Sequence, residues 1–259
     1  MPIITQHQVN PAGAPAVELF QATPDSTEPG GAILFVHGNQ GGRRTGARET
    51  VDTGTLLRFC TRLNITAAAV SQPGYGASAG PPDFCGPATQ QAIGLALAFL
   101  RAQPNVDPAR IVLYGYSRGA IASAMVATRD TMLRALVLGA GVYDLEALYR
   151  GAAPGIRWTI EQEAGATAEA FSARSALRHA DRIRTPTLIL HGRHDNRAPV
   201  AQAEELAEAL SDAGTTVSLR LFDCGHQIPP ELSRAAIRPL LRQAFAPPID
   251  VGRACSTLH

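Results

Sequence analysis

Residues 111–119 read Ile111-Val112-Leu113-Tyr114-Gly115-Tyr116-Ser117-Arg118-Gly119, and the alanine-rich residues 120–128 follow. The apolar run without polar alternation is typical of a strand covered on both faces, and residues 120–128 favour a helix. Between them, the sequence fits the pattern GxSxG, in which a serine lies at a sharp, strained turn between a strand and a helix. The flanking glycines let neighbouring backbone approach without a Cβ clash. We therefore predict that Ser117 is a nucleophile.

The same pattern occurs a second time, at Gly76-Ala77-Ser78-Ala79-Gly80. This copy follows the turn-like Pro73-Gly74-Tyr75-Gly76 and runs into Pro81-Pro82, so no helix begins directly after the serine. Its context disfavours Ser78 as the nucleophile. For Ser117 the alternative is a glycine-rich turn at a strand end that carries no chemistry.

Short apolar runs alternate with helical patterns on both sides of residues 111–119. This alternation predicts an α/β fold, in which helices cover both faces of a mostly parallel central sheet. Strands are expected at residues 32–36, 65–70, 111–114, 135–138, 187–190 and 217–222, with a hairpin or strand pair at 3–9 and 16–22. Helices are expected around residues 50–63, 89–102, 120–128, 200–213 and 231–245.

We expect residues 1–259 to form a single domain, because no internal repeat or linker divides them. Residues 143–181 interrupt the alternation with about forty residues of mixed helical character. Long insertions in such folds gather near the functional site, so this segment is predicted to be a small cap or lid. Residues 246–259 contain Pro247-Pro248 and no periodicity, and are expected to be a loosely packed tail.

A serine nucleophile needs a base, and the base needs an acid that orients it. Asp195 ends the sequence His191-Gly192-Arg193-His194-Asp195, just after the strand expected at 187–190. His226 lies in Asp223-Cys224-Gly225-His226, just after the last strand. A doubly wound sheet gathers its functional groups at the carboxyl ends of its strands. We therefore predict that Ser117, Asp195 and His226 form a catalytic triad.

Alternatives to these assignments remain open at this point. Asp144, after the strand at 135–138, is a second candidate for the acid. Asp195 and His226 have the ordinary readings of a turn-forming aspartate and a loop histidine bonded to backbone. The other histidines are weaker candidates for the base. His191 can be a satisfied polar group under the loop, and His194 can be a solvent-facing residue. His179 lies in the insertion, and His7 precedes the serine, whereas the expected order along the chain is Ser, Asp, His.

An oxyanion hole is the third requirement of this chemistry. The sequence His37-Gly38-Asn39-Gln40-Gly41-Gly42 follows the first core strand and forms a glycine-rich turn. We predict that the backbone N–H groups of Asn39 and Arg118, the residue after the nucleophile, hold the oxyanion. The alternative is an ordinary strand-to-helix turn.

The composition excludes several other functions. There are 23 basic and 22 acidic residues, so a net charge of +1 predicts neither a nucleic-acid nor a membrane surface. All basic residues are arginine, and the absence of lysine excludes a Schiff base or a P-loop lysine. No GxGxxG pattern opens a helix after a strand, and no His, Cys or Asp spacing matches a metal site. We therefore expect no cofactor.

The N-terminus and the cysteines predict a cytoplasmic location. Residues 1–7 contain no basic segment followed by an apolar run, so no signal peptide is expected. No stretch approaches the roughly 20 uninterrupted apolar residues of a spanning helix. The widely spaced Cys60, Cys85, Cys224 and Cys255 are expected to be free thiols.

Taken together, these motifs resemble the α/β-hydrolase superfamily over residues 31–245. Residues 107–119 and 186–192, with Ala198-Pro199-Val200 and the helical residues 204–210, are similar to the catalytic domain of the prolyl oligopeptidase family. The resemblance implies a serine hydrolase that acts on esters or amides without a cofactor. The chain has no room for the large β-propeller of prolyl oligopeptidases, and the residues that grip a peptide N-terminus in the exopeptidases have no identifiable counterpart.

The first functional hypothesis is therefore a carboxylesterase that cleaves small or medium acyl esters, with a small-molecule ester as its partner. An exopeptidase or acylaminoacyl peptidase is the alternative within hydrolases, and a non-catalytic binding protein is the alternative outside them. Tyr75 and Trp158 are candidate walls of the substrate pocket, together with Ile160 and Phe171. Each of these side chains has the competing reading of an anchor for its segment.

Overall fold

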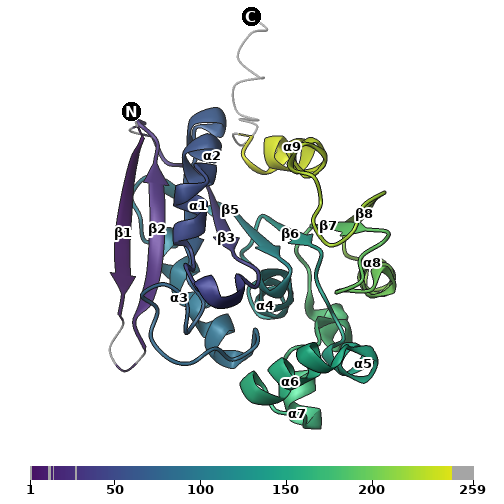
Figure 1. The fold of residues 1–259 in the computed structure, drawn as a ribbon. Helices are drawn as coiled ribbons and strands as arrows, with labels where there is room; N and C mark the ends of the chain where they lie inside the picture. The colour runs from purple at the N-terminus through teal and green to yellow at the C-terminus, as the bar shows by residue number, and fades with distance from the viewer. Residues whose placement is uncertain (1, 11–12, 14, 27, 247–259) are drawn as a thin grey trace, which may run out of the picture.

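The central feature of the computed structural model is one eight-stranded sheet with the strand order β1-β2-β4-β3-β5-β6-β7-β8 (Figure 1). The structure describes residues 2–10, 13, 15–26 and 28–246. β2 pairs antiparallel with β1 and β4, and every other neighbouring pair is parallel. The strands are β1 (Ile3–Val9), β2 (Val17–Thr23), β3 (Gly30–Val36), β4 (Thr66–Val70), β5 (Val106–Tyr116), β6 (Ala135–Gly139), β7 (Thr187–Gly192) and β8 (Val217–Phe222).

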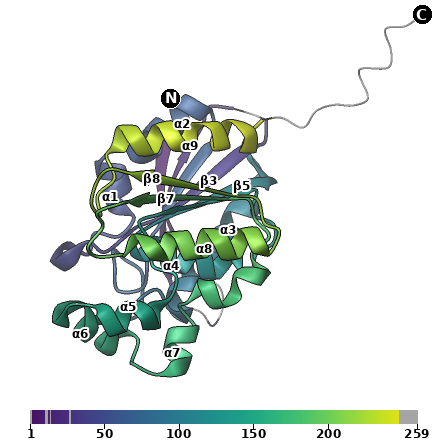
Figure 2. The ribbon, with the colours of Figure 1, turned by 90° about the vertical axis from the view of Figure 1, so that its right-hand side faces the viewer.

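Helices cover both faces of the sheet, which confirms the predicted architecture (Figure 2). Residues that follow each other in a strand point to opposite faces, so a strand between two helical layers must be apolar throughout. In β5, Leu113 packs in one core cluster and Val112 in the other. One layer contains α1 (Arg48–Asp52), α2 (Thr55–Leu63) and α9 (Pro230–Ala244), and the other contains α3 (Pro87–Arg101), α4 (Arg118–Ala127) and α8 (Val200–Asp212).

Two elements differ from the sequence-based expectation. The helix expected around residues 50–63 is divided into α1 and α2, because Gly54 between them adopts the left-handed conformation, with φ 67°. β5 begins at Val106, five residues before the apolar run, and pairs there with Gly30 of β3. The pairing then shifts register and resumes between Ala32 and Ile111, so the strand begins with an irregular stretch for which the hydrophobic pattern carries no signal.

The insertion between β6 and β7 forms a separate group of short helices at one side of the molecule (Figure 1). Ile160 and Phe171 are buried in the core and anchor the group, which is the second of the two readings given to them above. The buried Arg174 guanidinium also donates to the carbonyl oxygens of Asp83 and Phe84. The elements are α5 (Leu145–Gly151), α6 (Pro154–Glu163), α7 (Ala168–Ser172) and the 3-10 helix η2 (Ala176–Arg182).

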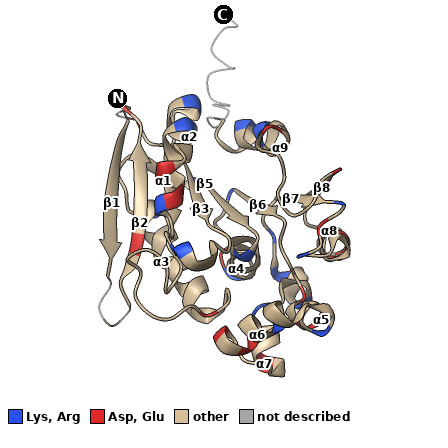
Figure 3. Cartoon of the chain, viewed as in Figure 1, with Lys and Arg blue, Asp and Glu red and all other residues tan. Residues whose placement is uncertain are grey.

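Charged residues of both signs are mixed along the helices, for example on α1 and α9 (Figure 3). Within the described part of the chain, no helix has both the length and the apolar character needed to cross a membrane. Cys60, Cys85 and Cys224 are free thiols. Cys255 and the rest of the predicted tail from residue 247 lie outside the described residues.

Candidate active site

The carboxyl edge of the parallel strands brings the predicted site residues together. Ser117 follows β5, Asp195 follows β7 and His226 follows β8; β7 and β8 are neighbours, and β6 lies between them and β5. The glycine-rich turn that begins at His37 follows β3, the other neighbour of β5. Four segments that are distant in the sequence therefore converge because their strands run in the same direction.

Ser117, His226 and Asp195 form one chain of hydrogen bonds. The Nε2 atom of His226 lies 3.0 Å from Ser117 Oγ, and its Nδ1 atom lies 2.8 Å from Asp195 Oδ2. A carboxylate oxygen can only accept, so Nδ1 carries the proton and Nε2 accepts the hydroxyl hydrogen of Ser117. This is the tautomer in which the imidazole can take a proton from the serine.

Asp195 is held as a buried carboxylate. Its side chain has no exposed surface, and its Oδ1 atom accepts from the backbone N–H groups of Arg197 and Ala198, both at 2.9 Å. Burial acts to raise the pKa of Asp195, but hydrogen bonds from His191, His226 and these two N–H groups outweigh it. The pKa therefore lies below its ordinary value, and the carboxylate stays charged beside the imidazole.

The turn that presents Ser117 is strained, as the GxSxG pattern predicts. Ser117 has φ 53° and ψ −119°, a conformation that few non-glycine residues adopt. A Cβ on Gly115 would lie 2.2 Å from the carbonyl oxygen of Gly119, and one on Gly119 would lie 2.1 Å from that of Val36. The two glycines therefore allow the helix α4 to start directly against β3 and β5.

The two predicted oxyanion donors belong to two segments that adjoin Ser117. A Cβ on Gly38 would lie 3.0 Å from the Cβ of Ser117, so a larger residue would be crowded where this turn passes the nucleophile. Asn39 follows Gly38, and Arg118 is the first residue of α4, where backbone N–H groups lack intrahelical partners. Within the described residues, neither of these two N–H groups has a hydrogen-bond partner.

His37 and Tyr75 support this turn from below. The Nε2 atom of His37 accepts from the backbone N–H of Gln72 at 3.1 Å, and its Nδ1 donates to the Gly38 carbonyl at 2.8 Å. Both bonds require the neutral ring, and burial lowers the pKa of His37. Tyr75 is buried and packs its ring 4.8 Å from that of His37. It therefore braces the turn and does not line the substrate cavity, in contrast to its predicted role.

A cavity of about 640 Å³ opens beside Ser117 and His226. Trp158, predicted as a pocket wall, is 63% exposed and is not part of its lining. That prediction is wrong, because the turn of α6 that faces the cavity carries Gly155, Ile156 and Thr159. On the side of the insertion, the apolar lining consists of Phe84, Ile121, Val142, Leu148 and Ile156.

The side chain of Arg118 connects the insertion with the turn that carries the nucleophile. Its guanidinium donates to Glu163 at the end of α6, with 2.7 Å between Nη1 and Oε2, and lies 4.3 Å above the ring of Phe84. The Arg118 and Glu163 side chains are 10% and 18% exposed. Only the backbone N–H of Arg118 was predicted to act, since no local signal in the sequence predicts a side-chain partner 45 residues away.

Two further residues contact the loops of the histidine and the aspartate: Tyr116, which no sequence pattern pointed to, and His191, which was expected as a satisfied polar group under the loop. Tyr116, inside the GxSxG pattern, donates from its hydroxyl to the carbonyl of His226 at 2.6 Å and accepts from the N–H of Ile228. His191 is fully buried, with its Nε2 atom 2.8 Å from the carbonyl of Ala198 and 3.4 Å from Asp195 Oδ2. Both residues hold loops of the site in place.

The competing candidates all have other contacts. Ser78 is buried, where its hydroxyl donates to the Ser71 carbonyl and accepts from the Glu18 N–H. Asp144 caps α5 by accepting from the N–H groups of Glu146 and Ala147. His194 pairs with Asp223 at the surface, His7 packs on Phe99, and His179 lies near the Ser172 carbonyl.

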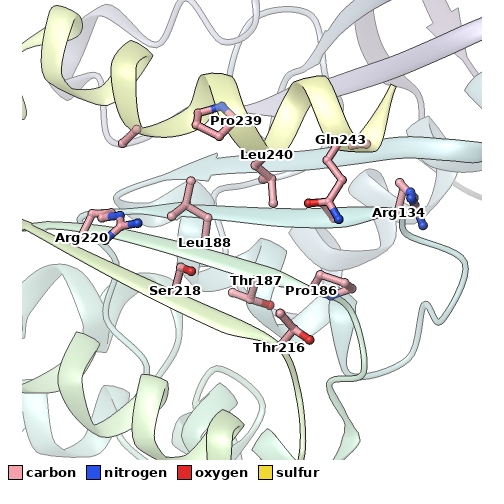
Figure 4. A pocket seen from close by; sticks show the side chains of 13 residues that line it. Arg134, Pro186, Thr187, Leu188, Thr216, Ser218, Arg220, Pro239, Leu240 and Gln243 are labelled. Atoms are coloured by element: carbon pink, nitrogen blue, oxygen red, sulfur yellow. The ribbon is translucent and has the colours of Figure 1, made fainter. Parts of the chain in front are cut away.

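A second cavity, of about 340 Å³, lies at the opposite end of the sheet (Figure 4). It is formed where Leu240 of α9 faces Thr187 and Leu188 near the start of β7. It therefore lies far from the carboxyl edge that carries Ser117.

Within the described residues, no three His, Cys, Asp or Glu side chains are grouped closely enough to hold a metal ion.

The mostly parallel sheet, with a strained serine at the carboxyl end of β5 and a hydrogen-bonded histidine and aspartate beyond it, defines the α/β-hydrolase class. Within this class, the sequence profile of the prolyl oligopeptidase family (Peptidase_S9) matches residues 88–242, more than half of the chain. The chain belongs to the prolyl oligopeptidase family, which confirms the predicted resemblance.

Two relatives from Bacillus subtilis (strain 168) show how much of the family the chain spans. It is 25% identical over 222 residues to the uncharacterized peptidase YtmA, covering 83% of this chain and 84% of YtmA. It is 29% identical over 126 residues to the uncharacterized peptidase YuxL, covering 48% of this chain but only 19% of YuxL. The chain thus spans a small part of some of its relatives.

Solved structures show the same fold. A Mycobacterium tuberculosis puromycin-hydrolyzing peptidase superposes with a TM-score of 0.80 at 23% identity, covering 95% of this chain and 40% of that one. The Pyrococcus furiosus esterase Pf2001 superposes with a TM-score of 0.72 at 15% identity, covering 94% and 93%.

Proposed function

We propose that this protein is a serine hydrolase that cleaves small carboxylic acid derivatives through an acyl-enzyme on Ser117. The observation that carries the proposal is the continuous hydrogen-bond chain from Ser117 Oγ through His226 to the buried Asp195 carboxylate. A non-catalytic binding protein needs none of these three groups, and it has no need of a strained serine.

Ser117 Oγ attacks the substrate carbonyl carbon while His226 Nε2 takes the hydroxyl proton. Asp195 stabilises the imidazolium that forms and keeps Nδ1 as the donor. The tetrahedral intermediate collapses when His226 returns the proton to the leaving alcohol or amine, and the acyl group stays on Ser117. Water then enters, gives a proton to His226 and releases the acid by the same steps in reverse order.

The negative charge of the tetrahedral intermediate would rest on the N–H groups of Asn39 and Arg118. Both belong to segments that adjoin Ser117, and the Arg118 N–H lies at the amino end of α4, where the helix dipole favours an anion. Loss of one such donor typically costs about 3–4 kcal/mol of transition-state stabilisation.

Family membership favours amide or peptide bonds, and the names of the two Bacillus relatives point the same way. The first hypothesis from the sequence was a carboxylesterase. The similarity in fold to the esterase Pf2001 is compatible with it. Both activities use the same acyl-enzyme, but an amide is stabilised by resonance and its nitrogen must be protonated before it leaves, so an amide is harder to cleave than an ester. We therefore expect ester hydrolysis in either case, and amide hydrolysis only from a peptidase.

The first test is labelling with a fluorophosphonate probe, which reacts with activated serines. Wild type and Ser78→Ala are expected to label, and Ser117→Ala is not. Folding of the variants is checked by circular dichroism, because Ser78 is a buried structural residue. A folded wild type that takes no label, or label retained in Ser117→Ala, contradicts the proposal.

The second test compares an aminoacyl anilide with an ester of the same acyl group. Turnover of both identifies a peptidase. Turnover of the ester with negligible turnover of the anilide identifies a carboxylesterase and removes the peptidase candidate.

A further inference from the structure

A third cavity, called the aromatic pocket below, has a volume of about 290 Å³. It lies on the α2 and α9 side of the sheet, next to the catalytic cavity. Its lining combines aromatic rings from β3, β5 and α2 with the charged side chains of Glu49, Arg58 and Arg234. Phe35 lies edge-on to Phe59 at 4.9 Å and 5.4 Å from Tyr114. Phe59 and Tyr114 are only partly buried, and the Tyr114 hydroxyl has no hydrogen-bond partner within the described residues. Covering apolar surface of this kind with a ligand lowers the free energy of the complex.

The pocket shares part of its lining with the catalytic cavity. Gly38, Glu49 and Tyr116 line both of them. Gly38 also adjoins the nucleophile, since a Cβ on it would lie 3.0 Å from the Cβ of Ser117. These shared residues place the aromatic pocket next to the space that a substrate bound at Ser117 would occupy.

The pocket lies on the histidine side of the reacting bond. Pro230 and Ser233, at the start of α9 just after the His226 loop, form part of its wall. Tyr116, another wall residue, is bonded through its hydroxyl to the His226 carbonyl. The leaving atom receives its proton from His226 Nε2, so the leaving group extends to this side. The acyl group then lies on the opposite side of the reacting bond, in the part of the cavity that the insertion lines.

We propose that the aromatic pocket formed by Phe35, Phe59, Tyr114 and Tyr116 binds an apolar, preferably aromatic, leaving group of the substrate. This inference rests on the proposed hydrolase function and adds the class of alcohol or amine that the enzyme releases. The space is sufficient, because an engineered cavity of about 150 Å³ is enough to bind benzene. Aromatic side chains also favour an aromatic ligand through edge-to-face contacts.

The test compares two acetate esters whose reacting bonds are electronically similar. Propyl acetate and 3-phenylpropyl acetate share the acyl group and the first three carbons of the alcohol, and differ only in the phenyl ring. The acid that each releases is followed by titration at constant pH. For wild type, kcat/KM is expected to be at least about tenfold higher for the phenylpropyl ester. A ratio near one overturns the inference.

Two variants locate the preference in the pocket. Phe59→Ala removes one wall, and Ser233→Trp fills the space from α9. Each is expected to lower the ratio of the two kcat/KM values to less than about threefold. Leu57→Ala and Leu232→Trp are the matched controls, because both residues are exposed neighbours on the same helices and neither lines the pocket. The ratio is independent of the fraction of folded enzyme, so a loss of stability does not obscure it.

The outcomes separate this inference from the proposed function. Turnover of propyl acetate with an unchanged ratio in both pocket variants overturns the leaving-group pocket and leaves the hydrolase standing. No turnover of either ester and no fluorophosphonate label on Ser117 removes the hydrolase and this inference with it.

Discussion

At the scale of single residues, the site depends on which hydrogen-bonding groups face Asp195. Its Oδ1 atom receives two backbone N–H groups, and its Oδ2 atom receives His226 Nδ1 and lies 3.4 Å from His191 Nε2. Three N–H groups donate to the two oxygens of this side chain, and only a carboxylate accepts at both positions. This arrangement fixes the tautomer of His226 and holds Asp195 in its charged form.

Asp195→Asn is expected to lower kcat by about 10³–10⁴-fold. The asparagine amide oxygen remains bonded to the Arg197 and Ala198 N–H groups, so the amide nitrogen faces His226. A donor there turns Nδ1 into the acceptor and puts the proton on Nε2, where it blocks proton transfer from Ser117. Asp144→Asn is the control, because asparagine also caps a helix. A comparable loss in the control would instead make Asp144 the acid.

The same residue predicts a pH dependence of stability. The folded-state pKa of Asp195 lies below the unfolded value of about 3.9. Its contribution to the free energy of unfolding is therefore fully present above about pH 4 and is lost as the pH falls through the folded-state pKa. Urea unfolding of wild type and Asp195→Asn should differ most near neutral pH and converge in acid. A difference that grows in acid would contradict this.

At the scale of elements, the turn from β5 to α4 sets the position of the nucleophile. The helix begins one residue after the strained serine, and its first turn passes against the backbone of β3 and β5. Both contacts depend on the absence of a side chain at the two glycines of the pattern. The spacing GxSxG is therefore a packing requirement of this turn as well as a signature of its chemistry.

Gly119→Ala is expected to destabilise the fold by about 1–3 kcal/mol and to reduce labelling of Ser117 strongly. The new Cβ would lie 2.1 Å from the Val36 carbonyl oxygen, so α4 must move and carry Ser117 with it. Gly94→Ala is the matched control in α3, since a Cβ there meets nothing within 4 Å. Alanine in a helix should raise stability by about 0.5–1 kcal/mol in this control. Thermal unfolding and labelling measure both effects, and equal results for the two variants would contradict the packing argument.

At the scale of the whole molecule, a small helical insertion lies over an otherwise regular three-layer fold. Its buried residues Ile160 and Phe171 join the main core, so the insertion is packed against the domain. The ion pair between Arg118 and Glu163 links it directly to the residue after the nucleophile. One largely buried contact therefore connects the insertion with the turn that carries the nucleophile.

Glu163→Ala is expected to lower the free energy of unfolding by about 1–3 kcal/mol, because it leaves the buried Arg118 charge without its partner. Amide hydrogen exchange in α6 should become faster. Glu161→Ala is the control on the same helix, where an exposed carboxylate accepts from the Tyr149 hydroxyl. Its expected effect is within about 0.5 kcal/mol. Similar exchange in both variants would show that the ion pair does not hold the insertion.

The sequence by itself determined the strand and helix alternation, the parallel sheet and the family. Apolar runs such as residues 111–114 have no polar alternation because both faces are covered, and this signal is local. The three residues Ser117, Asp195 and His226 were predicted from their positions after strands, and the structure brings them into hydrogen-bond contact. Their catalytic role stays a prediction for the labelling test.

Only the tertiary structure decided which side chains surround these residues. The sequence predicted Trp158 and Tyr75 equally as walls of the pocket. The path of the chain leaves Trp158 exposed and buries Tyr75 against His37. Glu163 reaches Arg118 across 45 residues, and the aromatic pocket joins rings from β3, β5 and α2. Hydrophobic periodicity reports whether a residue faces the interior, and it carries no information about which distant residue is found there.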